Sequence, residues 1–252
     1  MTKSNGKAAK YVYGVVRAGD GSLPKDGGIN DEPVKLVTTE GLAALTSDVP
    51  DEVLEAGREE LLTHARVLEQ ALEGGVVLPM RFGVVMPNER SVRDQLLTPH
   101  REELEAQLEE MDGKVEINIK GIYEEEAVLR EVLAENAEAA DLRQAIHGKP
   151  EDATYYERIR LGEVVAQALT VKRTEDERGI VDRLLGCAVA VEVSDVVHER
   201  MAVNASFLVA RDRRERFDRA VDELGEEHAG RIRLTYTGPL PPHSFVELGI
   251  EA

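Results

Sequence analysis

Two strand-like runs, each interrupted by proline and glycine, constrain the fold of this chain most. Residues 76–85 read VVLPMRFGVV and place Pro79 and Arg81 inside an apolar run. Because proline lacks the N–H that a ladder requires, such a run does not fit the centre of a sheet. Residues 234–245 alternate like a strand and then meet the sequence GPLPP, which disfavours both helix and ladder. We therefore predict that the last strand of the chain ends at Thr237.

The first part of the chain has the pattern of a small α+β domain. Alternating apolar and polar residues predict strands, and apolar residues at helical spacing predict helices. In chain order the expected elements are strands at 11–16, 34–38, 42–47 and 76–85, and helices at 50–73, 91–97 and 100–111. The apolar stripe of the first helix is expected to include Leu54, Leu61 and Leu68. We predict a domain at 11–112 behind a disordered tail at 1–10.

The second part of the chain has the order strand, long helical insertion, strand, strand, helix, strand. The expected strands lie near 114–122, 188–196, 202–210 and 231–237, with a helix at 213–225. The insertion, at 124–186, is expected to contain one helix that ends at Ile146 and a second that begins at residue 152. The apolar stripe of the second helix is interrupted at 172–177, and this helix should kink or end at Gly179. This is the ferredoxin-like βαββαβ order with an extended helical crossover. We therefore predict an α+β protein of two domains, the second at 113–252.

One face of the second sheet is predicted to be polar. The outward positions of its strands hold Glu116, Asn118, Lys120, Asn204, Ser206, Arg231, Arg233 and Thr235. Because the first and last strands are neighbours in a ferredoxin-like sheet, Glu116 and Arg233 are expected to form a cross-strand pair. Such a face is either solvated or docked on another surface, which makes Arg231 and Arg233 candidate partner-binding residues.

Arg81 and the adjacent Phe82 are the most suggestive functional candidates. A cation inside an apolar strand must be paired or must emerge at a surface. It could therefore bind an anion or a carboxylate of a partner, or it could pair with an acid of its own domain. The 49 acidic residues of the chain favour the internal pair. On that interpretation we expect Arg81→Ala to lower stability.

The GPLPP segment also has two interpretations. Gly238, Pro239, Pro241 and Pro242 could form a rigid, polyproline-like rod that is offered to a partner. Alternatively, the segment is a strap that packs Phe245 back onto the core. We favour the strap, because Phe245 is one of only four phenylalanines in the chain.

The sequence contains no recognisable catalytic, cofactor-binding or metal-binding motif. No two of the six histidines lie three to five residues apart, and the single cysteine, Cys187, lies in an apolar run and is expected to be buried and inert. Neither a nucleophile elbow nor a phosphate-binding glycine loop is present. His64 lies at the border of an apolar helix face, where a structural role is expected. We predict that the chain is not an enzyme.

The charge and hydropathy of the chain limit its partners. With a net charge of −18, the chain repels phosphate backbones, so we predict no nucleic-acid partner. No apolar run approaches the roughly 20 residues of a membrane span, and no signal peptide is visible. We therefore expect a cytoplasmic protein that does not enter a membrane.

Five segments in register resemble the gas vesicle protein family GvpF/GvpL. They are YVYG at 11–14, His64 on its helix, LPMRFG at 78–83, NASFLV at 204–209, and GPLPP at 238–242. The matching segments extend from near residue 11 to near residue 246. The chain departs from the family at His243, where the family often has Tyr, and at Leu240, where it often has Trp.

The resemblance implies an accessory or minor structural protein of gas vesicle assembly. Such proteins contact the small, very hydrophobic shell protein GvpA and other accessory proteins, and they limit aggregation of that subunit or help to nucleate the vesicle. The charge of −18 would supply the self-repulsion that a chaperone-like protein needs. Two alternatives remain: a small-molecule enzyme on a ferredoxin-like scaffold, and a regulatory module that senses a ligand.

Overall fold

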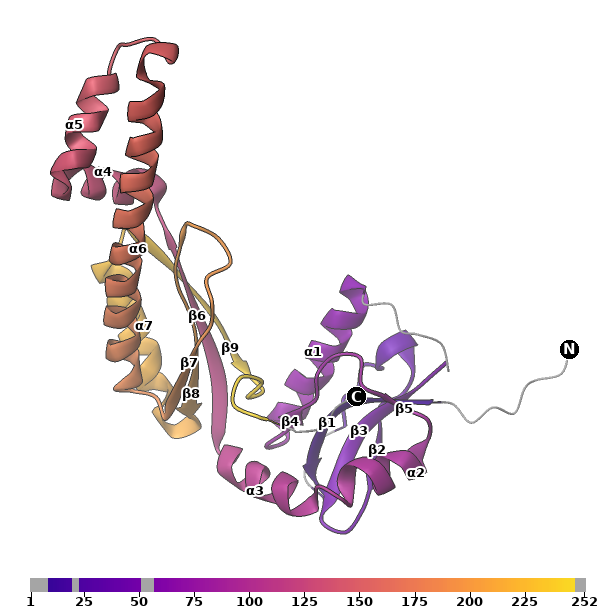
Figure 1. Cartoon of the computed structure of the whole chain (residues 1–252). Coiled ribbons are helices and arrows are strands. Elements are labelled where there is room, and N and C mark those ends of the chain that lie inside the picture. Colours follow the sequence, from indigo (N-terminus) through magenta and orange to yellow (C-terminus); the bar gives the residue numbers. More distant parts are fainter. Residues whose placement is uncertain (1–8, 20–22, 51–56, 248–252) are drawn as a thin grey trace, which may run out of the picture. The chain divides into compact units, whose positions relative to one another are not determined.

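The chain forms helices and antiparallel sheets that divide into two compact units. The computed structural model describes residues 9–19, 23–50 and 57–247 (Figure 1). One unit contains the described residues up to Glu116 and those from Gly238 on, and the other is Ile117–Thr237. The predicted second domain included the whole C-terminal end. Residues 238–247 instead belong to the first unit, because Ser244 hydrogen-bonds Glu116 there.

The first unit is built on one antiparallel sheet with helices beside it. Its elements are β1 (Ala9–Arg17), a 3-10 turn (Ile29–Asp31), β2 (Lys35–Thr38), β3 (Leu42–Val49), α1 (Arg58–Glu73), β4 (Leu78–Pro79), β5 (Val85–Met86), α2 (Glu89–Ser91), a π-helical stretch (Val92–Leu97) and α3 (Arg101–Met111). The strand order is β2-β3-β1-β4, and β5 also pairs with β1. The predicted hairpin of β2 and β3 is confirmed.

Strand β1 is the centre of this unit. It pairs with β3 on one side, and its residues from Ala9 to Val16 are all buried. Lys10 is among them and pairs with Asp48 and Glu89. The predicted tail at 1–10 therefore ends too late, because Ala9 and Lys10 already belong to the sheet; residues 1–8 lie outside the described part.

Helix α1 covers this sheet with a face that differs from the predicted stripe. Its buried residues are His64, Val67, Leu68, Ala71 and Leu72. Leu61, which was expected on the stripe, is 47% exposed because the buried face begins one turn later. The predicted start at Pro50 and the residue Leu54 cannot be compared, since residues 51–56 lie outside the described part.

The run at 76–85 is not one strand, as predicted, but two short strands joined by a loop. Both strands pair with β1, at Gly14 with Pro79 and at Tyr11 with Val85. Pro79 is tolerated because β4 stands at the edge of the sheet, where its missing N–H breaks no ladder. The chain turns at Gly83, whose φ of 92° lies in the left-handed region that favours glycine.

The second unit consists of a four-stranded sheet and four α-helices among its described residues. Its elements are β6 (Lys114–Tyr123), α4 (Glu125–Glu135), α5 (Ala137–Ile146), a 3-10 turn (Asp152–Thr154), α6 (Tyr155–Leu185), β7 (Ala190–Val193), β8 (Met201–Ala210), a second 3-10 turn (Arg211–Arg213), α7 (Arg214–Glu227) and β9 (Ile232–Leu240). The strand order is β7-β8-β6-β9, so β6 and β9 are neighbours, as predicted.

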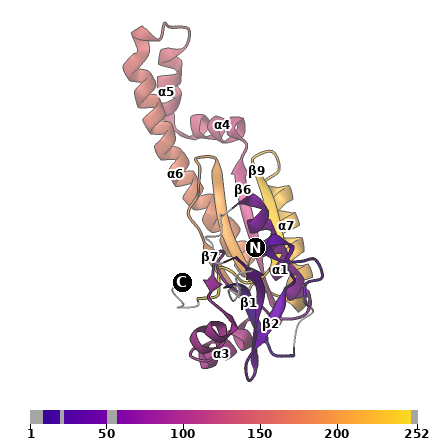
Figure 2. The ribbon, with the colours of Figure 1, turned by 90° about the vertical axis from the view of Figure 1, so that its right-hand side faces the viewer.

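The helices of this unit follow the predicted insertion with two differences. The expected helix from 124 to 146 is divided at Asn136, whose side chain accepts a hydrogen bond of 3.0 Å from the Ala139 amide and so caps α5. Helix α6 continues through Gly179 without ending and is about 46 Å long at 1.5 Å per residue. Helix α5 lies alongside α6 (Figure 2).

The core of the second unit lies between its sheet and helices α6 and α7. Phe207 of β8 contacts Phe217 of α7 with ring centroids 5.3 Å apart. Ile180 and Leu184 of α6 are fully buried in the same cluster. Cys187, which was expected to be buried, is half-buried and packs against this core. None of the described helices combines the length and the apolar content needed to cross a bilayer.

Two details of the strands contradict the predictions. Strand β9 does not end at Thr237 but continues to Leu240, because an edge strand can include Pro239. Glu116 and Ser206, which were expected to be exposed on the polar face, are covered, since each is only 4% exposed. The Glu116 carboxylate accepts both hydrogen bonds of Ser244, and the expected ion pair with Arg233 is not among those of the described residues.

Candidate functional site

Four rings from three separate parts of the first unit meet in one buried cluster. Tyr11 and Tyr13, two residues apart on β1, point to the same side of the sheet, and their ring centroids lie 4.8 Å apart. His64 of α1 lies 5.7 Å from Tyr13, with its ring stacked on the tyrosine ring. Phe82 contacts Tyr11 and His64 at 5.9 and 5.7 Å. The segments YVYG, His64 and LPMRFG, which carry the family resemblance in the first unit, therefore form one structural feature.

A chain of hydrogen bonds runs through this cluster and defines the tautomer of His64. The Gly83 amide donates to the Tyr11 hydroxyl at 3.1 Å, and that hydroxyl lies 2.8 Å from His64 Nδ1. His64 Nε2 lies 3.2 Å from the Met80 carbonyl oxygen, which can only accept. Nε2 therefore carries the proton, and Nδ1 accepts from Tyr11. We call Tyr11, His64 and their bonds to Met80 and Gly83 the loop clamp.

Burial keeps the loop clamp neutral. His64 is 6% exposed, and burial lowers the pKa of its imidazole to about 4. Burial likewise raises the pKa of the Tyr11 phenol above its usual range. At neutral pH the histidine is uncharged and the tyrosine keeps its proton, as the hydrogen-bond directions require. Because Tyr11 and His64 are buried, their hydrogen bonds hold the adjacent backbone in place.

The loop clamp presents Arg81 at the surface. Met80 and Gly83 flank Arg81 and Phe82, and both ends of this loop are bonded to the clamp. Arg81 is exposed, and it forms no ion pair or hydrogen bond with any other described residue. The predicted internal ion pair of Arg81 is not found among the described residues, where neutral groups rather than a carboxylate hold this loop.

Glycine at position 14 lets two elements approach β1 closely. A side chain at Gly14 would place its first carbon 2.7 Å from the Leu78 carbonyl oxygen and 2.9 Å from a methyl carbon of Leu68. Both distances are shorter than side-chain carbons tolerate. The glycine of the YVYG segment thus allows β4 and α1 to pack on the strand that carries both tyrosines.

The C-terminal segment of the first unit is bound to Glu116 rather than extended as a free rod. The Ser244 amide and hydroxyl each donate a 2.8 Å hydrogen bond to the Glu116 carboxylate. Pro241 and Pro242 are buried, Phe245 is half-buried, and Pro239 is exposed on β9. Of the four residues predicted as a partner-binding rod, Pro241 and Pro242 thus have little free surface.

Arg231, another predicted partner-binding residue, is engaged inside the second unit. Its Nε lies 2.8 and 2.9 Å from the two carboxylate oxygens of Glu131, and its terminal nitrogens each lie 2.8 Å from Asp176. Asp176 also accepts a 2.6 Å hydrogen bond from Tyr123. Desolvation lowers the pKa of Arg231, but the bonds to Asp176 and Glu131 outweigh it and raise the pKa overall.

Lys172 extends this network. It pairs with Glu131 at 3.1 Å and with Glu135 at 2.9 Å. Together with Arg231 and Asp176, these residues form an ion network that joins α4, α6 and the residue before β9. The polar stretch at 172–177, where the apolar stripe of α6 fails, is therefore explained by this network. Arg233, by contrast, is exposed.

The arrangement offers no evident cofactor or metal chemistry. Within 9–19, 23–50 and 57–247, no group of three or more His, Cys, Asp or Glu side chains is placed to hold a metal ion. The sequence correctly indicated a structural role for His64. It did not reveal that Tyr11, His64, Met80 and Gly83 converge, because only the tertiary fold brings β1, α1 and the loop together.

Comparison with known proteins gives a consistent result over almost the whole chain. The profile of the family described as gas vesicle synthesis protein GvpL/GvpF matches residues 9–247. The chain is 40% identical to gas vesicle protein F of Streptomyces sp. (strain CB03234), over 94% of this chain and 99% of that protein. It is 30% identical to gas vesicle protein F of Haloferax mediterranei, with 96% and 95% covered.

Two crystal structures are similar in fold. The structure of the gas vesicle protein GvpF from Anabaena sp. PCC7120 matches with a TM-score of 0.80 at 26% identity, covering 96% of this chain and 99% of that one. The structure of GvpF from Microcystis aeruginosa matches with a TM-score of 0.77 at 26% identity, covering 96% and 100%.

Proposed function

Because the chain belongs to the GvpL/GvpF family of gas vesicle synthesis proteins, and so has a role in gas vesicle assembly, we propose that it binds the hydrophobic shell protein GvpA and limits its aggregation. The family is one of gas vesicle proteins and is not known for catalysis. Other vesicle accessory proteins are further expected partners, and the cytoplasm, where a shell would be assembled, is the expected location.

The observation that carries this proposal is the exposed Arg81 on a loop fixed from beneath. A partner carboxylate that binds Arg81 would not have to displace an internal ion pair, because none is formed with the described residues. The loop clamp holds the adjacent backbone, so little conformational entropy is lost on binding. Phe82 is half-buried beside Arg81 and anchors the loop to the ring cluster. A rigid cation of this kind is typical of a recognition site.

Net charge supports the chaperone-like part of the proposal. At −18, copies of the chain repel one another, and a complex with an aggregation-prone subunit would inherit that repulsion. Arg233, Gly238 and Pro239 are further candidate contacts, whereas Arg231, Pro241 and Pro242 would act by fixing their surroundings.

The proposal is tested by the aggregation of purified GvpA in the presence of this protein. Wild-type protein should slow the rise in light scattering, and Arg81→Ala should lose most of that effect. The matched control is Arg90→Ala, because Arg90 is exposed on α2 of the same unit and forms only a surface pair with Asp94. Equal protection by both variants would remove Arg81 from the site, and no protection by the wild type would reject the GvpA proposal.

We also propose that the two compact units are separate domains and that the second is a modified ferredoxin-like domain. The strand order β7-β8-β6-β9 supports this, with helices α4, α5 and α6 as an extended first crossover. Native-state hydrogen exchange tests the division. Two domains should give two core groups of amides with different opening free energies, whereas one common value would indicate a single cooperative unit.

A further inference from the structure

Strand β7 is an open edge of the sheet in the second unit. In the strand order β7-β8-β6-β9 its one neighbour is β8, with which it pairs antiparallel from Ala190 with Leu208 to Val193 with Ala205. Within the described part of the chain, every residue from 189 to 200 is half-buried or exposed. The outer side of β7 is therefore accessible to a partner.

The register of β7 shows which of its backbone groups are unpaired. The Ser194 amide donates a 2.8 Å hydrogen bond to the Asn204 carbonyl oxygen of β8. Because backbone groups alternate between the two edges of a strand, the N–H and C=O groups of Val191 and Val193 point away from β8. No backbone hydrogen bond to another described residue uses them. Such a row of donors and acceptors is a template for one more strand.

The opposite edge of the same sheet is blocked, whereas β7 is not. Strand β9 contains Pro239, whose missing N–H prevents regular pairing at that position. Strand β7 has the sequence AVEV, without the proline or lysine that commonly protects an edge. The sheet therefore offers β7 as its available edge.

Exposed valines lie along this open edge. Val191 packs against the core of the unit, which places it on the face of the sheet that the helices cover. Val193 lies two residues further and shares that face, but it is 46% exposed. Val189 and Val197, on either side of the strand, are 50% and 77% exposed. An added strand with apolar residues on the same face as Val193 would cover this surface.

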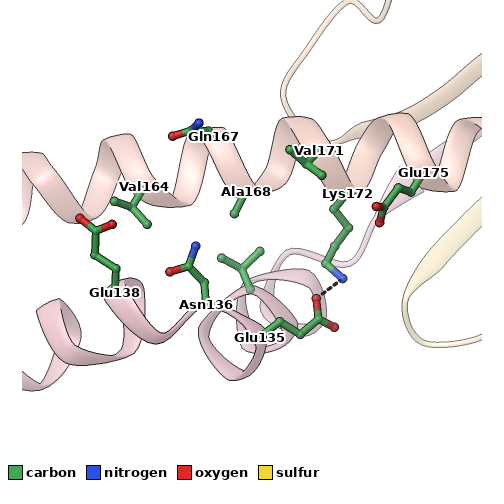
Figure 3. A pocket seen from close by; sticks show the side chains of 10 residues that line it. Glu135, Asn136, Glu138, Val164, Gln167, Ala168, Val171, Lys172 and Glu175 are labelled. Carbon is green, nitrogen blue, oxygen red and sulfur yellow. Dashed lines mark ion pairs between the residues drawn. The ribbon is translucent and has the colours of Figure 1, made fainter.

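The charges of the open edge are acidic and uncompensated. Glu192 is exposed on the other face of β7, and its cross-strand neighbour is Ser206. Asp195 is also exposed, and neither carboxylate forms an ion pair with a described residue. The carboxylates beside α6 differ, since Lys172 already compensates Glu135 (Figure 3). A cation opposite Glu192 would therefore gain a partner without displacing another one.

We propose that β7 binds an extended segment of a partner protein as an added antiparallel strand, in which apolar residues alternate with Lys or Arg. Antiparallel pairing is the more stable orientation. In it, the residues opposite Val191 and Val193 share their face and donate their N–H groups to β7. The basic residues then lie on the face of Glu192.

A basic segment suits this edge better than a second copy of the chain. Pairing of two β7 strands would bring both Glu192 side chains near each other on one face, and each chain carries a net charge of −18. The inference goes beyond the proposed function, because it concerns the second unit and backbone pairing rather than the Arg81 loop.

The experiment measures binding of a labelled nine-residue peptide, in which valine and lysine alternate, by fluorescence anisotropy. A second peptide has the same composition without the alternation, and a third has glutamate in place of lysine. Wild-type protein should bind the alternating lysine peptide at least tenfold more tightly than the other two. Equal binding of the non-alternating peptide would show that charge attraction alone is at work and would overturn the proposal.

Backbone methylation of the peptide tests the strand pairing itself. Methyl groups on the valine nitrogens remove the N–H groups that would donate to β7, so binding should weaken at least tenfold. Methyl groups on the lysine nitrogens change only the outer edge of the added strand, so binding should stay within about threefold. Equal effects of the two modifications, or a larger effect at lysine, would contradict the proposal.

Two variants of one residue locate the binding to β7. Val193→Pro removes an outward N–H but no hydrogen bond to β8, and it should weaken binding of the alternating lysine peptide at least tenfold. Val193→Thr is the matched control, because it keeps the N–H and the β-branched shape. Thermal melts of both variants show whether the sheet is intact, and the methylated peptides test the wild type independently. Equal binding by the two folded variants would overturn the proposal.

A charge reversal tests the predicted basic residues. Glu192→Lys should weaken binding of the alternating lysine peptide several-fold and strengthen binding of the glutamate peptide. Glu69→Lys, at an exposed position on α1 of the other unit, changes the net charge equally and should do neither. Equal effects of the two reversals would contradict the proposal. Sedimentation of the unliganded protein completes the test. A wild-type dimer that Val193→Pro dissociates would show that a second copy covers β7, and the proposal would fail.

Discussion

The loop clamp of the first unit and the ion network of the second unit are stabilised in opposite ways. In the first unit, the loop clamp uses neutral groups, Tyr11 and His64, that are almost fully buried. In the second unit, Arg231, Glu131 and Asp176 form an ion network whose side chains are 14–30% exposed. Buried neutral hydrogen bonds are insensitive to salt, whereas partly exposed ion pairs are screened by it. The comparison teaches that the loop carrying the exposed Arg81 is held by neutral hydrogen bonds and not by an ion pair among the described residues.

The largest expected loss of stability comes from removing a hydrogen-bonding group of the loop clamp. Tyr11→Phe keeps the ring but removes the hydroxyl, which leaves the Gly83 amide and His64 Nδ1 without their partner. An unsatisfied buried group such as His64 Nδ1 costs about 1–3 kcal/mol, whereas the exposed Gly83 can bond water, so we expect a loss of about 1–3 kcal/mol in unfolding free energy. Chemical denaturation checks this. A loss below about 1 kcal/mol would show that water replaces the hydroxyl.

Lowering the pH should destabilise the loop clamp of the wild-type protein through His64. The pKa of His64 is about 4 in the folded protein and near 6.5 when unfolded. Well above pH 6.5, His64 is neutral in both the folded and the unfolded protein, and its contribution to the unfolding free energy is fully present. As pH falls toward 4, only the unfolded state gains the proton, so stability decreases by up to about 3 kcal/mol.

Denaturation curves at several pH values check this prediction, with His64→Gln as the control. Hydrogen bonds to Lys10 and Lys35 lower the pKa of Asp48 from 3.8. Desolvation raises the pKa of Glu131, but its bonds to Arg231 and Lys172 outweigh this and lower it from 4.5, so both contributions are lost as the pH falls below these ordinary values. The interval from pH 4.5 to 6.5 therefore isolates the histidines. A wild-type protein whose pH dependence equals that of His64→Gln in this interval would contradict the assignment.

The ion network should give a smaller and salt-dependent effect. Arg231→Ala leaves Glu131 and Asp176 facing each other without their shared cation. Because the network is partly solvated, we expect a loss of about 1–2 kcal/mol at low salt, less than for a fully buried pair. The difference from wild type should shrink in 0.5 M NaCl, while that of Tyr11→Phe should not. Equal salt dependence of both variants would remove the distinction between the two units.

The smallest effect is expected at Arg81. Arg81→Ala removes an exposed side chain that has no ion-pair partner among the described residues, so the unfolding free energy should change by less than about 0.5 kcal/mol. A calorimetric melt of the variant beside wild type checks this. A fall in melting temperature of several degrees would mean that the cation stabilises the unit after all.

Periodicity and chain order predicted the secondary structure better than the tertiary contacts. The hairpin of β2 and β3 and the long helix α6 follow from local patterns that the sequence displays directly, and the adjacency of β6 and β9 was inferred from the order of the elements along the chain. Two breaks were not predicted. The break at Asn136 depends on a helix cap, and the break within 76–85 depends on a loop that is bonded to the distant Tyr11.

The candidate site was only partly predictable for the same reason. Arg81 and Phe82 were proposed from their position within an apolar run, and the internal carboxylate partner expected for Arg81 is not found among the described residues. Sequence reasoning treated a cation in a strand as a charge in need of a counter-charge. The fold instead places Arg81 on a loop. The side chains of Tyr11 and His64, which are distant from each other in sequence, hold that loop in place.

Amide hydrogen exchange at Gly83 tests most directly the claim that the loop clamp holds the Arg81 loop. Its N–H donates to Tyr11, so exchange should be slow in the wild type and at least tenfold faster in Tyr11→Phe. The amides of β3 serve as the control for global unfolding, since they belong to the same unit. The account predicts acceleration at Gly83 beyond that of β3. Equal exchange at Gly83 in the two proteins, or acceleration no greater than in β3, would contradict it.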